Sequence, residues 1–216
     1  MMRKNFDCQL SEMHDELVIM GELCEKAIAA AISPLGKRGG EAKAALSDSL
    51  INEKEREIEQ LCMRLLMQQQ PVAGDLREIS AALKMISDME RIGDQACDIA
   101  DIAVHITPND PCPEESHLRK MAKDAAKMVN ESIDSFVARD VELARKVICY
   151  DDIVDKWFYD IKAELICKIA SDSENGGYYV DLLMIAKYLE RVGDHATNIA
   201  EWVEYSITGE HRKYKQ

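Results

Sequence analysis

The sequence predicts an all-α protein built as two tandem three-helix bundles that are related by internal duplication. Three observations carry this prediction: apolar residues recur at helical spacing in six segments, the breaks contain helix-ending residues, and the sixth segment repeats the third. With 47% apolar and 31% charged residues, the 216-residue chain can form a core. Its five prolines and ten glycines are few for an all-β protein of this size.

The six expected helices are separated by ordinary turn chemistry. Pro34 ends the first helix and glycines follow it, whereas Pro71 and Gly74 mark the second break. Asp75, with Glu78 three residues later, has the spacing of a capping box for the third helix. The expected helices span 9–32, 41–69, 75–106, 118–138, 140–170 and 180–207.

The second half of the chain follows the same logic. Asp140 is placed to cap the fifth helix, and Asn175-Gly176-Gly177 separates the fifth helix from the sixth. The segment 107–113 holds three of the five prolines and is the best domain boundary. We therefore expect one three-helix unit in residues 1–107 and a second in residues 114–216.

The two units repeat each other. Met-Glu-Arg-Ile-Gly-Asp at 89–94 recurs as Leu-Glu-Arg-Val-Gly-Asp at 189–194, and the alanines and isoleucines that follow also coincide. Asp48 and Asn52 in the second helix match Asp151 and Asp155 in the fifth. On a helix with about 100° per residue, the apolar residues of each repeated segment form one stripe that should face the core.

Acidic residues occupy nearly the opposite side of the third and sixth helices, so they should face outward. Such a stripe is either a solvated acidic face or part of an oxygen-ligand site for a hard cation such as Mg²⁺, Mn²⁺, Ca²⁺ or iron, and the residues alone leave both open. The stripes comprise Glu90, Asp94, Asp98 and Asp101 in the first half and Glu190, Asp194, Asn198 and Glu201 in the second.

Composition excludes several classes of protein. A net charge of −13 repels nucleic acids and anionic lipids, and no basic patch overrides it. No apolar run approaches a membrane span, and charge precedes any hydrophobic region at the start, so we expect a cytoplasmic protein without a secretory signal. The seven cysteines contain no CxxC pair and should be buried, reduced thiols.

Catalytic motifs are absent from the sequence. There is no GxSxG, P-loop, GxGxxG or HExxH, so we expect no enzymatic activity. His195 has Gln95 as its counterpart and should be a surface or capping residue, and His117 belongs to a single Glu-x-x-His, whereas a di-iron bundle needs two.

Three segments closely resemble the PhoU family of phosphate-signalling proteins: Gln70–Arg77, Glu90–Asp94 and Leu189–Glu201. The resemblance covers nearly the whole chain. It implies a cytoplasmic accessory protein that negatively regulates phosphate uptake by the phosphate-specific ABC transporter and represses phosphate-regulon signalling. The implied partners are the transporter's ATPase subunit and a sensor histidine kinase, with only peripheral contact with membrane complexes and none with nucleic acid. For a helical regulator of this kind we also expect a homodimer.

Some members of that family carry multinuclear iron or zinc clusters on Glu/Asp-xxx-Asp motifs, which implies a divalent cation bound by carboxylates here. Asn52 and Asn198 stand where a carboxylate would ligate better, and Lys37-Arg38-Gly39-Gly40 departs from the family's acidic turn. The metal candidates are Asp48, Glu90 and Asp94 in the first half, Asp151, Asp155, Glu190 and Asp194 in the second, and Asp98, Asp101 and Glu201 as weaker additions.

Two alternatives to a contact regulator remain. A metal-dependent, hydrolase-like enzyme would use paired carboxylates to hold two metals that activate water, and it would need its acids in a closed, partly dry pocket. A generic helical scaffold has the same composition as a regulator. With acidic stripes and few clustered arginines, direct binding of phosphate is not expected.

Overall fold

The structure is a computed structural model that describes residues 2–35, 44–68, 71–106 and 113–210, with side chains described within 5–35, 49–67, 71–106 and 115–210. This part of the chain forms six α-helices and one short 3-10 turn, so the all-α prediction is confirmed. The elements are α1 (Met2–Ile32), α2 (Ala44–Gln68), α3 (Ala73–His105), α4 (Pro113–Val137), α5 (Val141–Ser171), η1 (Ser173–Asn175) and α6 (Gly176–Thr208).

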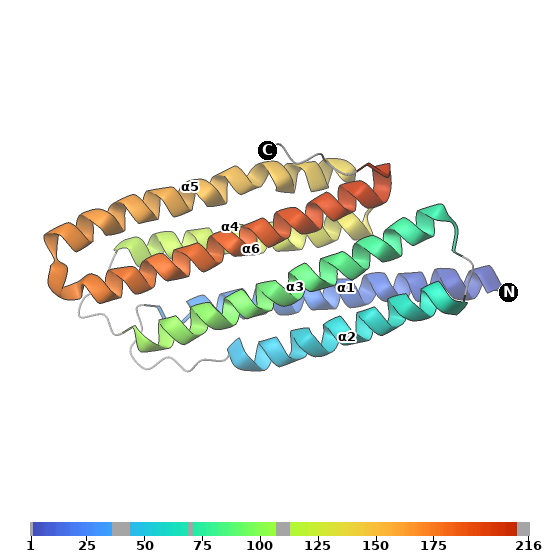
Figure 1. The fold of residues 1–216 in the computed structure, drawn as a ribbon, viewed down its shortest axis with the longest axis horizontal. Helices are drawn as coiled ribbons and strands as arrows, with labels where there is room; N and C mark the ends of the chain where they lie inside the picture. The colour runs from blue at the N-terminus through green and yellow to red at the C-terminus, as the bar shows by residue number, and fades with distance from the viewer. Residues whose placement is uncertain (1, 36–43, 69–70, 107–112, 211–216) are drawn as a thin grey trace.

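The helices form two packed layers. Figure 1 shows α5, α6, α3 and α2 side by side in a front layer, with α1 and α4 behind them. The helices of each half pack on one another, and α3 also packs on α6 while α1 packs on α4. All six helices contribute to one hydrophobic core. The two halves are therefore separate bundles along the chain but a single unit in packing.

The apolar stripes of α3 and α6 face this core, as the periodicity predicts. On α3, Met89, Ile92 and Ile99 have no exposed surface, and on α6 the same is true of Leu189 and Val192. Burial of side chains of this size contributes about 1.5–3 kcal/mol each. The spacing of these residues therefore determines which face of each helix packs on the core.

Helix starts agree with one predicted cap and contradict another. Asp140 Oδ1 accepts hydrogen bonds from the backbone N–H groups of Glu142 and Leu143, both at 3.0 Å, so the cap on α5 is confirmed. The predicted Asp75 capping box is wrong, because α3 begins earlier and the Val72 backbone N–H donates to Asp75 Oδ2 at 3.1 Å. Glu78 is thereby released for another contact.

That contact joins the two halves. Glu78 Oε1 lies 2.8 Å from His14 Nε2 of α1, and Glu78 Oε2 accepts a hydrogen bond from Arg139 in the turn between α4 and α5. The Glu78 side chain is only 7% exposed. Burial would raise the pKa of Glu78, but the His14 hydrogen bond and the Arg139 charge hold it below its ordinary value. We call Glu78, His14 and Arg139 the Glu78 clamp.

The cysteines correct a second prediction. Cys24 and Cys62 are buried, and burial raises the pKa of each thiol to about 12, but Cys8, Cys149 and Cys167 are exposed. Helical periodicity alone did not show which cysteines lay on outer faces.

Several sequence-based predictions fall outside the described residues. They concern the first turn at 36–40, the linker at 107–112 with Cys112, and the side chain of Asp48. None of the described helices is long and apolar enough to cross a membrane.

Candidate functional site: a carboxylate face on α5 and α6

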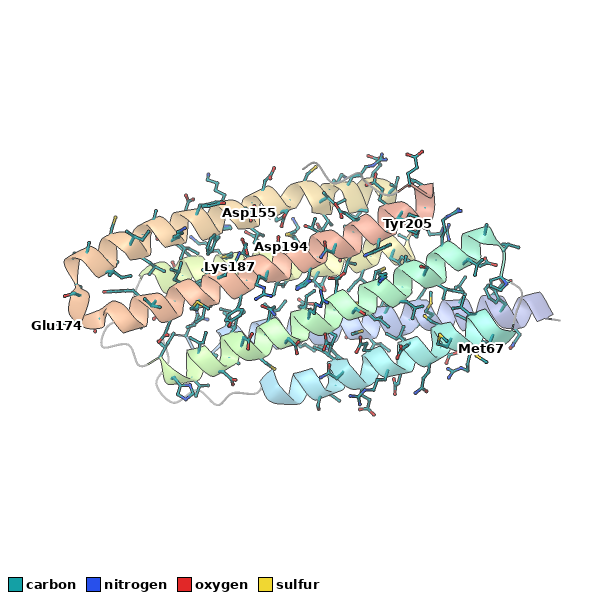
Figure 2. The ribbon with its side chains drawn as sticks, viewed as in Figure 1. Met67, Asp155, Glu174, Lys187, Asp194 and Tyr205 are labelled. Carbon is teal, nitrogen blue, oxygen red and sulfur yellow. The ribbon has the colours of Figure 1, made fainter. Side chains whose placement is uncertain are left out.

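Four of the predicted residues come together where α5 lies against α6. Asp151 and Asp155 project from α5, and Glu190 and Asp194 project from α6; Figure 2 shows Asp155 and Asp194 on these neighbouring helices. The helices approach closely because residue 193 is glycine. A Cβ at Gly193 would lie 3.2 Å from Asp151 Oδ1, which is tighter than an ordinary contact. We call these four carboxylates the acidic face.

The carboxylates of the acidic face repel one another. Burial, followed by the charges of Asp155 and Asp194, raises the pKa of Asp151 from 3.8 to about 6. Burial and then Glu190 also raise the pKa values of Asp155 and Asp194. Asp155, Glu190 and Asp194 thus each make ionisation of a neighbouring acid harder, and the native fold holds these charges together at a cost in free energy.

A lysine partly compensates this repulsion. Lys187, one turn before Glu190 on α6, forms an ion pair with Glu190 and lowers the pKa values of Asp155 and Asp194. Figure 2 shows Lys187 on the same stretch of α6 as Asp194. Sequence reasoning missed Lys187, although its i, i+3 spacing to Glu190 was a usable signal.

The first half carries a looser arrangement. Glu90 is half-buried, whereas Asp94, Asp98 and Asp101 are exposed. Burial, Asp94 and Asp101 raise the pKa of Asp98, and Arg191 from α6 opposes this shift. The acids of α3 therefore face a cation from the other half of the molecule.

Glu55 was missed by sequence reasoning and joins this group. Burial, then Glu59, with a smaller contribution from Asp94, raises the pKa of Glu55, so its carboxylate and that of Asp94 interact. Glu55 lies about one turn after Asn52 on α2. It supplies an acid close to Asn52, which stands where the second half has Asp155. The duplicated pattern could not reveal Glu55, because the matching residue of α5 is Phe158.

Glu201 stands apart from the acidic face. It lies about two turns beyond Asp194 on α6, is half-buried, and is not among the groups that shift the pKa values of Asp151, Asp155 or Asp194.

The oxygen donors of the acidic face suit a hard cation by their chemistry, but their present positions do not form a metal site. Carboxylate oxygens suit hard cations, and mutual repulsion would fall if a cation bound among them. Within the described residues, however, no group of three His, Cys, Asp or Glu side chains is arranged to hold a metal ion. Glu190 is engaged by Lys187, and Asp194 is exposed.

His195 corrects the surface or capping role that we predicted. Its Nδ1 lies 2.9 Å from Asp88 Oδ1 on α3, and the Asn198 amide donates to the same oxygen at 3.3 Å. The His195 side chain is 12% exposed. Since Asp88 and His195 come from different halves, only the tertiary structure could show that this histidine links α3 to α6.

Fold and site together define a class of protein: an internally duplicated, all-α protein with an acidic stripe on the third helix of each half. The model of one such family, described as the PhoU domain, matches residues 17–103 and 118–203. The chain belongs to the PhoU family, so the resemblance found in the sequence is confirmed.

Relatives match along nearly the whole chain. A protein of Clostridium acetobutylicum, named phosphate-specific transport system accessory protein PhoU homolog, is 34% identical over 97% of both chains. The crystal structure of PhoU from Pseudomonas aeruginosa matches with a TM-score of 0.87 at 34% identity, over 95% of this chain and 100% of that one. The phosphate transport system regulatory protein PhoU from Streptococcus pneumoniae matches with a TM-score of 0.87 at 27% identity, over 96% and 99%.

Proposed function

We propose that this protein is a cytoplasmic accessory regulator of phosphate transport that works by contact. It lowers phosphate uptake by binding the ATPase subunit of the phosphate-specific ABC transporter. Through a sensor histidine kinase it also represses phosphate-responsive transcription. The observation that carries this proposal is the match to phosphate-transport accessory proteins over 97% of both chains.

The physical arrangement supports a role in binding. Asp194 is exposed and the other three residues of the acidic face are half-buried, and neighbouring acids raise the pKa values of Asp151, Asp155 and Asp194. A basic patch on a partner would relieve this repulsion, so association gains electrostatic free energy that the isolated protein lacks. A hydrolytic two-metal centre would instead need a closed, partly dry pocket. A partner-binding surface fits this geometry better than a catalytic one.

Co-purification with both partners tests the regulatory role. We expect the transporter ATPase and the kinase to be retained, with amounts that differ between high and low phosphate. The double variant Asp155→Lys/Asp194→Lys should weaken retention, whereas Asp160→Lys, on an exposed position of α5 outside the acidic face, should not. The proposal fails if neither partner is retained in any condition and deletion of the protein leaves phosphate-responsive transcription unchanged.

The acidic face also binds a divalent cation in this proposal. Asp151, Asp155, Glu190 and Asp194 would hold it after side-chain rotation and release of Lys187 from Glu190, and the cation would offset the repulsion among the four acids. Their mutual pKa shifts support this, whereas their present orientations do not converge on one point.

Elemental analysis of protein purified without a chelator or an affinity tag tests cation binding. We expect iron, zinc or another divalent metal above trace level, and loss of most of it in Asp155→Asn/Asp194→Asn but not in the control Asp160→Asn. Absence of metal, with none taken up on soaking, would contradict the proposal. The proposed homodimer is tested separately by sedimentation equilibrium.

A further inference from the structure

A groove lies between α1 and α4, the two helices behind the front layer of Figure 1. It has a volume of about 510 Å³. Its apolar lining comes from Ile28, Ala29 and Ile32 on α1 and from Ala122 and Ala126 on α4. Three of these five side chains are alanines, which leave room above the two helices.

The groove has the dimensions of a helix-binding site. Along α4 its lining runs from Arg119 to Glu131, which at 1.5 Å per residue is about 18 Å, or about three helical turns. A smaller hollow of about 230 Å³ continues past Asn130 toward Gly21, where a Cβ would clash with Ile133. The side chain of Ile133 thus occupies the space beside Gly21. The groove of about 510 Å³ lies farther along, where the lining residues include alanines instead of large side chains.

The α4 rim of the groove carries three cations in a chain whose net charge is −13. Arg119 donates a hydrogen bond to the backbone carbonyl of Ile32 at 3.3 Å, so its guanidinium is held at one end of the groove. Lys123 is exposed and has no ion-pair partner within the described residues. Lys127 lies 3.9 Å from Glu131 and 4.3 Å from the centre of the Tyr150 ring on α5, so its ammonium already has partners.

The nearby aspartate does not neutralise these cations. Asp124 turns toward α5, where it accepts hydrogen bonds from the Trp157 indole at 2.9 Å and from the Tyr150 hydroxyl at 3.1 Å. On the α1 rim, Glu25 accepts a hydrogen bond from Asn130 at 2.8 Å. The groove therefore presents an apolar floor, with Arg119 and Lys123 toward one end and the acids Glu25 and Glu131 toward the other.

We propose that this groove binds an amphipathic helix of a partner protein, with acidic side chains beside its apolar stripe. The apolar stripe packs on the alanines between α1 and α4, and the acids pair with Lys123 and Arg119. A flat anionic membrane fits less well, because it would meet Glu25 and Glu131 as well as the cations and could not enter the concave floor. This inference does not depend on the identity of the transport partner.

Binding of a synthetic helix to the full-length protein tests the proposal. The probe is a fluorescein-labelled 14-residue peptide with leucines at helical spacing and glutamates flanking them, and its control has lysines in place of the glutamates. Titrations followed by fluorescence anisotropy should show at least about tenfold tighter binding of the glutamate peptide, with affinity falling as salt rises.

Matched variants locate the site. Ala29→Trp fills the groove and should abolish peptide binding, whereas Ala163→Trp, at an exposed position of α5, should not. Lys123→Glu should weaken binding about tenfold, and Lys156→Glu on α5 should leave it unchanged. Ala29 is exposed, so circular dichroism should show the native helical content in both tryptophan variants.

Three results would overturn the inference: no binding of the glutamate peptide, equal binding of both peptides, or unchanged binding in Ala29→Trp. Vesicles containing phosphatidylglycerol provide the remaining arm. If Lys123→Glu reduces binding to these vesicles while the peptide does not bind, the groove is a lipid contact and the proposal is wrong. A failed transporter pull-down would leave the peptide result standing, so the two proposals are distinguishable.

Discussion

Replacing Glu78 by glutamine should destabilise the protein, because the Glu78 clamp ties three segments together. The Glu78 side chain, 7% exposed, contacts His14 on α1 and Arg139 after α4. Glutamine keeps the size of the side chain but removes its charge. The substitution therefore isolates the electrostatic part of a contact that joins the first half of the chain to the second.

The magnitude follows from the exposure of the partners. A hydrogen bond to a charged group contributes about 1.5–3 kcal/mol, and solvent screening at Arg139, which is 52% exposed, moves its share to the lower end of that range. We expect Glu78→Gln to lower the free energy of unfolding by about 2 kcal/mol at pH 7, or about 4–8 °C in Tm for a chain of this length.

The pH dependence has a definite sign. The pKa of Glu78 in the folded protein lies below its ordinary value of 4.5, so its contribution is fully present above that value. The contribution is lost as the pH falls through the folded pKa, where the carboxyl group becomes neutral like glutamine. The difference between wild type and Glu78→Gln should therefore shrink below about pH 4.

Urea denaturation followed by circular dichroism measures these effects in a double-mutant cycle with Arg139→Gln. We expect a coupling of about 1 kcal/mol between Glu78 and Arg139. Glu22→Gln is the control, since Glu22 forms an ion pair with Lys26 in which the Glu22 side chain is 59% exposed and the Lys26 side chain 65%. This substitution should change the free energy of unfolding by less than about 0.5 kcal/mol. An effect of Glu78→Gln equal to this control, or one that persists at low pH, would refute the reasoning.

Three further predictions concern α5 and α6 and are checked by the same unfolding measurements. Gly193→Ala should destabilise the protein by about 1 kcal/mol or more, because its Cβ would press on Val154 and Asp151 at 3.2 Å, whereas Gly177→Ala, with open space around it, should stabilise by about 0.5–1 kcal/mol; equal effects would disprove the close packing. Asp140→Ala should cost about 1 kcal/mol through loss of the α5 cap, and no loss would show that the cap is dispensable. Asp151→Asn should raise stability by about 1–2 kcal/mol at pH 7, after allowance for solvent screening, because the pKa of about 6 means that ionised Asp151 opposes folding. That gain should vanish below about pH 4, and a gain that persisted there would exclude the electrostatic explanation.

Local sequence signals succeeded where one helix sufficed to create them. The stripe containing Ile92 and Val192 predicted which sides of α3 and α6 are buried, and both residues have no exposed surface. Asp140 needed only its own helix start to act as a cap. The prediction of Asp75 as the N-cap residue was wrong because α3 begins at Ala73. Val72 is the N-cap, and Asp75 is the N3 residue whose side chain accepts a hydrogen bond from the Val72 backbone N–H.

The candidate site was predicted in its residues but not in its environment. Asp155 and Asp194 followed from the duplicated motif, whereas Lys187 and Glu55 lie outside that motif, and the structure showed their charges near these acids and Asp94. A repeat reports what two halves share, so it cannot identify a residue that only one half carries.

The sequence by itself determined the helical class, the duplication and the buried apolar stripes of α3 and α6, because periodicity and capping act over a few residues. The tertiary structure decided how the halves combine. Packing of α3 on α6 and of α1 on α4 places Asp88 beside His195, joins Glu78 to Arg139, and leaves the groove that Ala29 lines. These contacts join residues 61 or more positions apart, and they form only when one shared core brings both halves together.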